Sequence, residues 1–447
     1  MPSPKTVHLG TFDAEAFWRD PELARLPALP DPAAGRIVAA MDELLFPGCQ
    51  PGDLLLTRLP MDASLADYLG RVGFVFEHNR TALDDGAIRE PPASIFEILQ
   101  TAPPALVHGL LTGVERVAPY AIIPAAEAFC RKYSLPLAGP APAAVSRVNS
   151  KVYSHQVAVD LGLKAYGCQV TSPAELVEQG RRSLAYGTLI VKDPFGVAGK
   201  DNLPIQSGAI LERIGGHLAA QEKKGKRVSL VVEPFLAKKL DFSCQMHIDP
   251  DGQVHFLSLQ QMHNQHLTYQ GSSRLDAEQA AGLEQGGYFG KLEAVAARLY
   301  RDGYWGHGCI DSMVLQDGTV IPVVEINARQ SMGLINHHLD QFFGPDRLST
   351  SLACLSVGYP GPLCFAELLE ELERAGLLFT RRQGCGIMPL SANTLLVNLN
   401  APAQPSLPGR LRKGRFYFSI LASPGERPAW LEKLRCFFRE LGFSVYS

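Results

Sequence analysis

The sequence predicts an α/β protein that is divided into two or three domains. A chain of 447 residues is too long for one simple hydrophobic core. Apolar segments typical of strands alternate with segments typical of helices over residues 52–134, which favours a parallel α/β layer. The composition changes at the Pro- and Ala-rich segment 135–150 and again after Asp340. We therefore expect an N-terminal α/β domain (1–145), a central domain (146–345) and a small C-terminal α/β extension (346–447).

The composition excludes several classes of protein. A chain with 46% hydrophobic and 19% charged residues has an ordinary soluble composition. The net charge of −3, without a basic run, argues against nucleic acid as a partner. No apolar segment approaches the ~18–20 residues that span a bilayer, and residues 1–10 lack the pattern of a signal peptide. Nine cysteines without a CxxC pair or zinc-ligand spacing indicate reduced thiols. We expect a cytoplasmic protein that does not bind membranes.

The N-terminal region predicts alternating helices and strands after an irregular start. Residues 1–30 show no clear periodicity. Helices are expected over 33–45, 64–73, 94–100 and 125–134, and strands over 52–59, 74–78 and 120–124. No G-x-G-x-x-G follows any of these strands, so we expect no dinucleotide site here. Segment 135–150 is expected to be a linker.

The central region opens with two helices that carry clear start signals. Ser150 can cap a helix that runs to about Leu161, which places Lys151 in its first turn. Residues 172–175, Ser-Pro-Ala-Glu, match a capping box and start a helix to about Tyr186. This helix leads into a strand, 188–192, that bears the candidate site residues described next.

A lysine and a glycine loop follow at the end of that strand. Lys192 ends the apolar run, and Gly196, Gly199 and Lys200 lie in the loop behind it. Glycines let backbone N–H groups approach phosphate oxygens, and a strand-end lysine can act as a point charge on a phosphate. A mobile hairpin without a ligand explains the same residues. The missing Ser or Thr after Lys200 excludes a Walker loop.

Two further segments carry polar side chains at strand ends. In 229–249 an apolar strand ends at Glu233, a linker contains Phe235 and Leu236, and Asp241 is expected to open the next strand. Such a linker can present backbone groups to an adenine edge, with Asp241 on ribose hydroxyls. Segment 263–274 follows a strand over 254–259 and has no periodicity. It is a candidate substrate loop in which Arg274 could meet a carboxylate, or an ordinary polar surface loop. A helix is expected over 291–303.

The segment 303–333 is the most informative stretch of the chain. A hairpin is expected around Asp317-Gly318, followed by Glu325, Asn327 and Arg329 at spacing two, which places them on one face of a strand. Carboxylate and amide oxygens suit Mg²⁺, and a guanidinium suits phosphate or carboxylate. A strand that runs into a charged surface loop is the alternative.

The turn of this hairpin decides whether two carboxylates can share one metal ion. A two-residue loop at Asp317-Gly318 would put Asp311 and Glu325 on opposite faces. A three-residue loop, Asp317–Thr319, or an equivalent bulge near Pro322, pairs Asp311 with Glu325. We predict the odd-length loop or the bulge.

In this order and spacing, these segments resemble the ATP-grasp superfamily of ATP-dependent carboxylate–amine ligases. The resemblance covers roughly residues 145–345 and is most specific from Asp311 to Gly333. The ending EINARQSMG looks most like that of peptide ligases of biosynthetic pathways. The resemblance implies an α+β ATP-grasp domain behind an N-terminal α/β domain. It also implies ATP and Mg²⁺ as cofactors, with Mn²⁺ as an alternative metal, and a small-molecule carboxylate and amine as substrates.

The same resemblance implies a role for each candidate residue. The nucleotide would be bound by Lys151, Lys192, Gly196, Gly199, Glu233, Phe235, Leu236 and Asp241. The metal would be held by Asp311, Glu325 and Asn327, and the catalytic residues would be Arg329, Lys192 and Lys200. The substrate would contact Arg274, Arg329, Ser331 and Gly333. The implied reaction proceeds through an acyl phosphate and releases ADP and phosphate. A bicarbonate-activating carboxylase and a non-catalytic ATP-binding module remain as alternatives.

The C-terminal region predicts a small α/β unit. Helices are expected over 347–358, 364–376 and 428–442, and strands over 386–399 and 415–423. This extension could complete the site of the second substrate or form an oligomer contact, for example in a homodimer. The sequence does not choose between the two.

Overall fold

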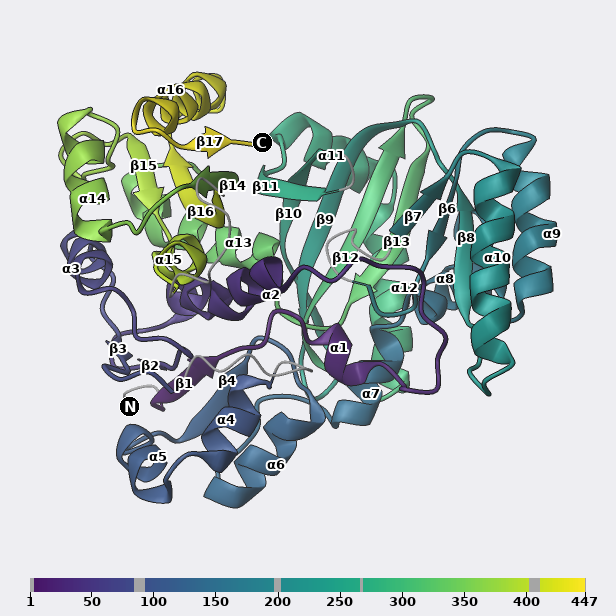
Figure 1. Ribbon diagram of the computed structural model, residues 1–447, viewed down its shortest axis with the longest axis horizontal. Helices are drawn as coiled ribbons and strands as arrows, with labels where there is room; N and C mark the ends of the chain where they lie inside the picture. The colour runs from purple at the N-terminus through teal and green to yellow at the C-terminus, as the bar shows by residue number, and fades with distance from the viewer. Residues whose placement is uncertain (1–3, 84–92, 197–201, 266–267, 402–410, 447) are drawn as a thin grey trace.

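The computed structural model describes residues 4–83, 93–196, 202–265, 268–401 and 411–446, and it contains three β-sheets. Figure 1 shows a parallel sheet near the N-terminus, a large antiparallel sheet through the middle, and a small sheet with two helices on the far side. The predicted α/β class and the N-terminal parallel layer are confirmed. In the described part of the chain, no helix is long and apolar enough to cross a membrane.

The N-terminal sheet is parallel and has the strand order β3-β2-β1-β4. Its strands are β1 (Thr6–Leu9), β2 (Leu54–Leu55), β3 (Glu77–His78) and β4 (Arg116–Pro119). Around it lie α1 (Glu15–Trp18), α2 (Pro32–Ala39), the 3₁₀ helix η1 (Ala40–Gly48), α3 (Ala63–Val72), α4 (Ile95–Thr101), α5 (Pro104–Leu110), α6 (Pro124–Tyr133) and α7 (Pro142–Val148).

Three predictions for this region are wrong. Residues 1–30 contain β1 and α1, the strand expected over 120–124 is β4 and ends before it, and the expected linker 135–150 contains α7. Strand β1 lies inside the sheet and is buried along nearly its whole length. It therefore lacks the alternation of apolar and polar residues by which a half-buried strand is recognised in a sequence.

The small sheet is antiparallel and has its own hydrophobic core. Its strands, in the order β5-β8-β6-β7, are β5 (Cys168–Val170), β8 (Leu230–Pro234), β6 (Leu189–Lys192) and β7 (Asn202–Ile205). The predicted helices appear as α8 (Lys151–Asp160) and α9 (Pro173–Leu184), and α10 (Gly208–Glu222) packs against α9. Ala24 and Leu26, from the N-terminal region, belong to this core.

The large sheet has nine strands in the order β13-β12-β9-β10-β11-β14-β16-β15, with β17 beside β14. They are β9 (Lys238–Ile248), β10 (Val254–Gln265), β11 (Thr268–Arg274), β12 (Gly306–Leu315), β13 (Val320–Asn327), β14 (Thr350–Tyr359), β15 (Gly386–Pro389), β16 (Arg412–Leu421) and β17 (Ser444–Val445). The described helices of this part are α11 (Ala277–Gln285), α12 (Tyr288–Arg301), α13 (Met332–Phe343), η2 (Gly344–Asp346), α14 (Phe365–Arg374), α15 (Asn393–Leu399) and α16 (Arg427–Glu440). The strands of the expected C-terminal extension therefore continue the sheet of the central region.

The structure corrects several expected elements of this sheet. Segment 347–358, expected as a helix, is mostly β14, and the strand expected over 386–399 divides into β15 and α15. Segment 263–274 is the end of β10 followed by β11, and β9 begins at Lys238 rather than at Asp241. Strand β14 lies between β11 and β16 and is mostly buried, so its run of small apolar residues carries no strand period.

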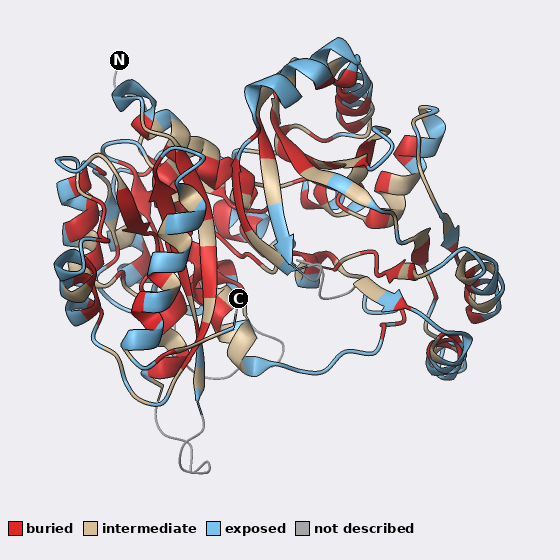
Figure 2. Cartoon of the chain, turned by 90° about the horizontal axis from the view of Figure 1, so that it is seen from above, coloured by how far each residue is buried: buried red, intermediate tan, exposed pale blue. Residues whose placement is uncertain are grey.

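The N-terminal and C-terminal regions share one hydrophobic core. The largest cluster of buried residues runs from Val7 to Phe443 and takes in the strands of both the parallel and the large sheet. Figure 2 shows the same pattern, with buried residues along the strands and exposed residues on the outer helix faces. The carboxylate of Glu43, in η1, accepts hydrogen bonds from the backbone N–H groups of Ala392 (3.0 Å) and Asn393 (2.9 Å) at the start of α15.

A long connection ties the N-terminal region to the small sheet. Residues 19–31, the N-terminal strap, join α1 to α2 and run across to the small sheet (Figure 1). Leu23 forms a parallel bridge with Arg227, and the N–H of Ala24 donates to the carbonyl of Arg227 at 2.8 Å. The strap thus closes one side of the cavity described next.

Candidate functional site

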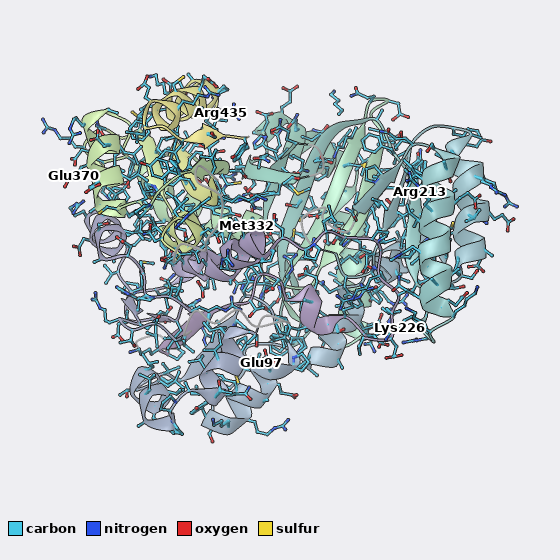
Figure 3. The ribbon with its side chains drawn as sticks, in the orientation of Figure 1. Glu97, Arg213, Lys226, Met332, Glu370 and Arg435 are labelled. Atoms are coloured by element: carbon cyan, nitrogen blue, oxygen red, sulfur yellow. The ribbon has the colours of Figure 1, made fainter. Side chains whose placement is uncertain are left out.

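One cavity of about 590 Å³ is lined by residues of the N-terminal region, the small sheet, the large sheet and the N-terminal strap. Met332, which lies near the middle of the molecule in Figure 3, is part of its wall. The cavity brings together twelve of the residues expected to form the site: Lys192, Gly196, Glu233, Phe235, Leu236, Asp241, Asp311, Glu325, Asn327, Arg329, Ser331 and Gly333. Residues that are up to 141 positions apart in the chain, from Lys192 to Gly333, thus surround one space.

The register of the β12–β13 hairpin places two carboxylates side by side. Asp311 pairs with Glu325, as predicted. The loop itself differs from the prediction, because Leu315 donates its N–H to the carbonyl of Thr319 at 2.9 Å, which leaves 316–318 as the loop. A bulge next to Asp311 then shifts the register by two residues. Pro322 lies in the bulge, and its carbonyl accepts a hydrogen bond from the Ser312 hydroxyl at 2.8 Å.

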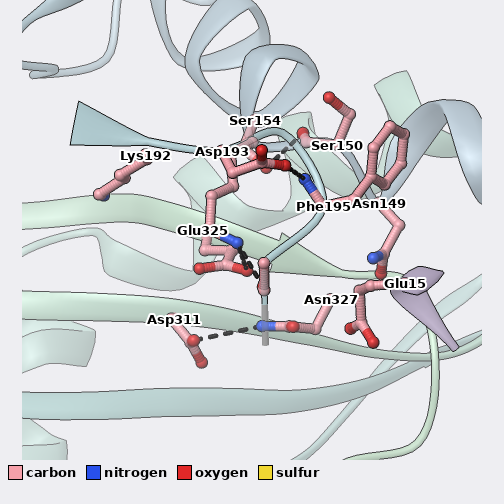
Figure 4. Close-up of polar contacts among 12 residues, drawn as sticks. Glu15, Asn149, Ser150, Ser154, Lys192, Asp193, Phe195, Asp311, Glu325 and Asn327 are labelled. Atoms are coloured by element: carbon pink, nitrogen blue, oxygen red, sulfur yellow. Dashed lines mark hydrogen bonds and ion pairs between the residues drawn. The ribbon is translucent and has the colours of Figure 1, made fainter. Parts of the chain in front are cut away.

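The donor set around Asp311 fits a hard divalent cation. Burial, and then the nearby charge of Glu325, raise the pKa of Asp311 to about 7. The amide of Asn327 donates to Asp311 at 3.2 Å, and Figure 4 shows this contact below Glu325. The described residues contain no group of three His, Cys, Asp or Glu that could hold a metal ion. A cation here would use the two carboxylates and the amide oxygen of Asn327, and would take further oxygen ligands from phosphate or water.

Two buried lysines form ion pairs with carboxylates of the candidate site. The ammonium group of Lys151 is 3.0 Å from Glu325 and donates to the carbonyl of Gly196 at 2.6 Å. Ser150 caps α8 as expected, and the backbone N–H of Lys151 donates to the carbonyl of Pro194 at 3.0 Å. Lys151 therefore fixes the turn after β6 against the start of α8.

Lys192 ends β6 and lines the same cavity. Its ammonium group is 2.6 Å from the carboxylate of Glu233, across the β6–β8 pair. Both lysine side chains are less than a tenth exposed. A buried lysine keeps its charge only beside an anion, so the two ion pairs mark sites where a phosphate could compete for the cation.

The far end of this part of the cavity contains the groups expected to face adenine and ribose. Phe235 is half exposed, and its N–H donates to the carbonyl of Thr188 at 2.8 Å. Asp241 forms an ion pair with Lys238 and accepts a hydrogen bond from the amide of Asn264 at 3.1 Å. Leu236 completes this wall.

Arg329 is held on all sides by groups of the protein. Its Nε donates to Glu15 at 2.8 Å, one Nη donates to Asn327 at 3.0 Å, and the other donates to the hydroxyl of Tyr120 at 3.2 Å. The guanidinium also lies over the ring of Tyr120, 5.6 Å from its centroid. These contacts place a fixed positive charge next to the carboxylate pair.

The start of α13 forms the adjoining wall. Ser331 caps this helix through the N–H of Leu334 at 3.0 Å, and its hydroxyl donates to the side chain of Gln245. A Cβ on Gly333 would lie 2.5 Å from the amide nitrogen of Gln245, so a side chain does not fit there without a shift. The Ser331–Gly333 turn thus packs directly on β9.

Four expected residues are not part of the cavity wall that the structure describes. Lys151 is buried and contacts the wall through its ion pair with Glu325. Arg274 is exposed at the end of β11 and is not part of the cavity wall. Gly199 and Lys200, and with them most of the loop 196–200, lie outside the described residues.

The cavity also contains residues that the sequence patterns missed. Glu15 and Tyr120 come from the N-terminal region, Arg19 pairs with Asp193 behind β6, and Arg415 and Tyr417 come from β16. These residues lie in short or irregular segments, or in a strand far along the chain. The closely spaced acidic residues Asp13 and Glu15 in an apolar segment were the one local pattern that could have indicated a functional role for this region.

No protein-family model and no curated protein sequence matches this chain. Solved structures match it at low sequence identity over nearly their whole length. N5-carboxyaminoimidazole synthase from Aspergillus clavatus is 14% identical, with a TM-score of 0.52, over 97% of this chain and 99% of that one.

N5-carboxyaminoimidazole ribonucleotide synthetase from Thermus thermophilus is 13% identical, with a TM-score of 0.51, over 97% of this chain and 98% of that one. The biotin carboxylase domain of 2-oxoglutarate carboxylase from Hydrogenobacter thermophilus is 14% identical, with a TM-score of 0.50, over 99% of this chain and 90% of that one. All three belong to the ATP-grasp superfamily. The likeness over the whole chain and the arrangement of its sheets show that this protein has the ATP-grasp fold.

Proposed function

We propose that the protein is an ATP-dependent ligase that joins a small-molecule carboxylate to an amine through an acyl phosphate. The observation that carries this proposal is the convergence of Asp311, Glu325, Lys192 and Arg329 on one cavity, with Lys151 paired to Glu325. Two carboxylates, two lysines and an arginine are the groups that a polyphosphate with a divalent cation requires. The ADP-bound and Mg-ADP-bound states named for similar folds agree with this choice of nucleotide.

Each side chain has a role that follows from its place. Lys192 and Lys151 exchange their carboxylate partners for phosphate oxygens, and Asp241 with the segment Glu233–Leu236 binds the nucleoside. Asp311, Glu325 and Asn327 would hold Mg²⁺ or Mn²⁺, which would neutralise charge on the terminal phosphates. Ser331 and Gly333 border the acid substrate.

The reaction begins with attack of the substrate carboxylate on the γ-phosphorus, which breaks the bond to the β-phosphate oxygen and releases ADP. Arg329 stabilises the negative charge on the transferring phosphoryl group, because its guanidinium is already fixed by Glu15, Asn327 and Tyr120. The amine then attacks the acyl carbon, and phosphate leaves with the C–O bond electrons. The acyl phosphate hydrolyses readily, so the site has to exclude water while this intermediate is bound.

A second candidate is a ligase in which bicarbonate is the acid. The likeness to carboxyaminoimidazole synthases and to a biotin carboxylase domain over nearly the full chain favours it. Both candidates use the same phosphate-binding residues and differ in the acid that enters beside Arg329. A homodimer and a cytoplasmic location, both expected from the sequence, remain predictions.

The test is to trap the activated acid. The full chain is incubated with ATP, Mg²⁺, hydroxylamine and a panel of amino acids and other carboxylic acids. We expect ADP, phosphate and the hydroxamate of the true acid. Bicarbonate-dependent ATP cleavage without an added acid would instead select the second candidate. AMP as the nucleotide product, or no acid-dependent cleavage at all, would contradict both and favour another mechanism or a non-catalytic ATP-binding module.

A further inference from the structure

Outside the metal-binding group, two partly buried charged side chains in the cavity have no ionic partner among the described residues. By contrast, Arg19, Lys192, Lys238 and Arg329 each form an ion pair with a carboxylate. Arg415, on β16, forms none within the described residues, and its Nε is buried without a hydrogen-bond partner. A buried guanidinium without an anion is costly, so it is retained where an anionic ligand completes it.

Arg415 lines the cavity next to the aromatic side chain of Tyr417. Its Nη1 donates to the hydroxyl of Tyr417 at 3.3 Å, and that hydroxyl donates to the sulfur of Met41 at 3.5 Å. Tyr120, whose hydroxyl accepts a hydrogen bond from Arg329, lines the same cavity. Each of the two arginines therefore contacts a tyrosine hydroxyl in the cavity wall.

The second unpaired group is a carboxylate on the opposite region of the chain. Asp13 lines the cavity, and its Oδ1 is buried without a hydrogen-bond partner. Phe12, next to it, stacks on Tyr120 with ring centroids 3.9 Å apart. In the described chain, Asp13 forms no ion pair, whereas Asp193, Glu233 and Asp241 do. The cavity thus presents a cation and an anion, each unpaired among the described residues, near an apolar and aromatic wall.

We propose that Arg415 and Asp13 bind the second substrate, and that this substrate is an amino acid with a free carboxylate and an apolar side chain. The inference rests on the proposed ligase function and specifies its amine. Arg415 pairs with the carboxylate of the amino acid, Asp13 accepts a hydrogen bond from its amine, and Phe12, Met41 and Tyr417 contact its side chain.

We place the donor acid elsewhere in the cavity, because its carboxylate must reach the γ-phosphorus beside Asp311, Glu325 and Arg329. A single guanidinium matches the single charge of a carboxylate, whereas a phosphate monoester carries nearly two charges and needs further cations. The residues 346–447 thus complete the site of the amine through β16.

Calorimetric binding tests this inference without turnover. The full chain, loaded with Mg²⁺ and a non-hydrolysable ATP analogue, is titrated with leucine, methionine or phenylalanine and with their carboxamides. We expect at least one free amino acid to bind, and its carboxamide to bind roughly ten- to hundredfold more weakly. Arg415→Ala should weaken binding of the free amino acid by a similar factor and leave binding of the carboxamide unchanged. Arg415→Lys should recover part of the difference.

The role of Asp13 is tested by comparing an amino acid with its deaminated analogue. Asp13→Asn should weaken binding of the amino acid but not of its deaminated analogue, for example 4-methylpentanoate for leucine. Lys413→Ala is the matched control, because Lys413 lies on the same strand, is exposed and pairs with Asp31. This variant should bind like the wild type.

The outcomes separate the inference from the proposed function. Two results with the variants and ligands would overturn the inference: equal binding of the free amino acid and its carboxamide, or an unchanged affinity of Arg415→Ala for the free amino acid. Tighter binding of a phosphorylated amino acid, or no binding of any of these amino acids, would also overturn it. Hydroxamate formation from an acid in the trapping experiment would leave the ligase function standing in each of these cases. Amino-acid binding without any hydroxamate would support the binding site and contradict the ligase function.

Discussion

At the scale of single residues, Lys192 is the clearest test of the phosphate site. Its charge is buried and is balanced only by Glu233, at 2.6 Å, in the described structure. We expect Lys192→Ala to reduce ATP turnover at least a hundredfold, because the phosphate then lacks a charge-assisted contact. The variant should unfold in urea with a cooperative transition like that of the wild type, which would show that it is folded. Lys223→Ala, at the exposed end of α10, should keep normal turnover. Full turnover in Lys192→Ala would remove this lysine from the site.

Glu15 is a positioning residue, since it acts through Arg329. Its carboxylate is 2.8 Å from the Nε of Arg329 and is almost fully buried. Glu15→Gln should keep the hydrogen bond but remove the charge, so the guanidinium is held less firmly. We expect kcat to fall roughly tenfold while the KM for ATP changes less than threefold. Glu127→Gln, on the exposed face of α6, is the control. An equal change in KM and kcat would indicate a role in ATP binding.

At the scale of the elements, the β11–β14 pair joins the central region to the C-terminal region. Gly271 lies in this pair, opposite Ala353. A Cβ at Gly271 would collide with the carbonyl oxygen of Leu352 and lie 3.0 Å from the Cα of Ala353, so the two strands must separate. We expect Gly271→Ala to lower the free energy of unfolding by roughly 2 kcal/mol or more.

Gly282→Ala provides the matched comparison for that change. Gly282 lies inside α11, and a Cβ there meets no atom within 4 Å. This substitution should leave the stability unchanged or raise it by up to about 1 kcal/mol, because alanine favours a helix. Urea unfolding of both variants measures the difference. Equal stabilities would show that the β11–β14 pair tolerates separation.

At the scale of the whole molecule, histidines from several elements gather near the boundary of the parallel sheet, the large sheet and α13. His247 and His307 face each other across β9 and β12, with ring centroids 4.5 Å apart. His337 and His338 lie on α13, and His8 lies on β1. Asp249 lies 3.2 Å from His247, and Asp53 lies 3.2 Å from His8.

The buried histidines should contribute less stability as the pH falls. Burial, and then the charges of other histidines, lower the pKa of His307 from 6.5 to about 3 and that of His338 to about 4. At these two sites the unfolded chain binds more protons than the native state below pH 6.5, so their protonation favours unfolding. We expect the histidines to lower the free energy of unfolding by roughly 2 kcal/mol or more between pH 7 and pH 5. The buried carboxylates of Asp42, Glu43 and Asp311, whose pKa values are raised, act in the opposite direction over the same range.

The variant His307→Gln should make the contribution of the histidines smaller, since it removes one of the buried rings that must stay neutral. His108→Gln, at an exposed position on α5, should keep the full pH dependence. Urea unfolding at several pH values between 5 and 7 gives the slopes. The same slope in His307→Gln as in the wild type would contradict the assignment.

The sequence by itself determined the class of the fold and most of the residues that we propose to bind phosphate. Local signals sufficed there: spacing of two along β13, a capping serine before Lys151, and a lysine at the end of β6 each depend on residues close in the chain. The pairing of Asp311 with Glu325 was also predictable, because the period of a strand leaves only two registers. The bulge at Pro322, which produces this pairing, was one of the two predicted alternatives.

Only the tertiary structure decided which distant segments complete the site. Glu15, Tyr120 and Arg415 come from three separate regions, and their contacts depend on how the sheets meet rather than on any local pattern. Strand β14 was mistaken for a helix for the same reason: its state is fixed by its neighbours β11 and β16, which lie far from it on either side in the chain. Residues buried on both faces lose their period, so contacts between distant segments, and not the local sequence, set their structure.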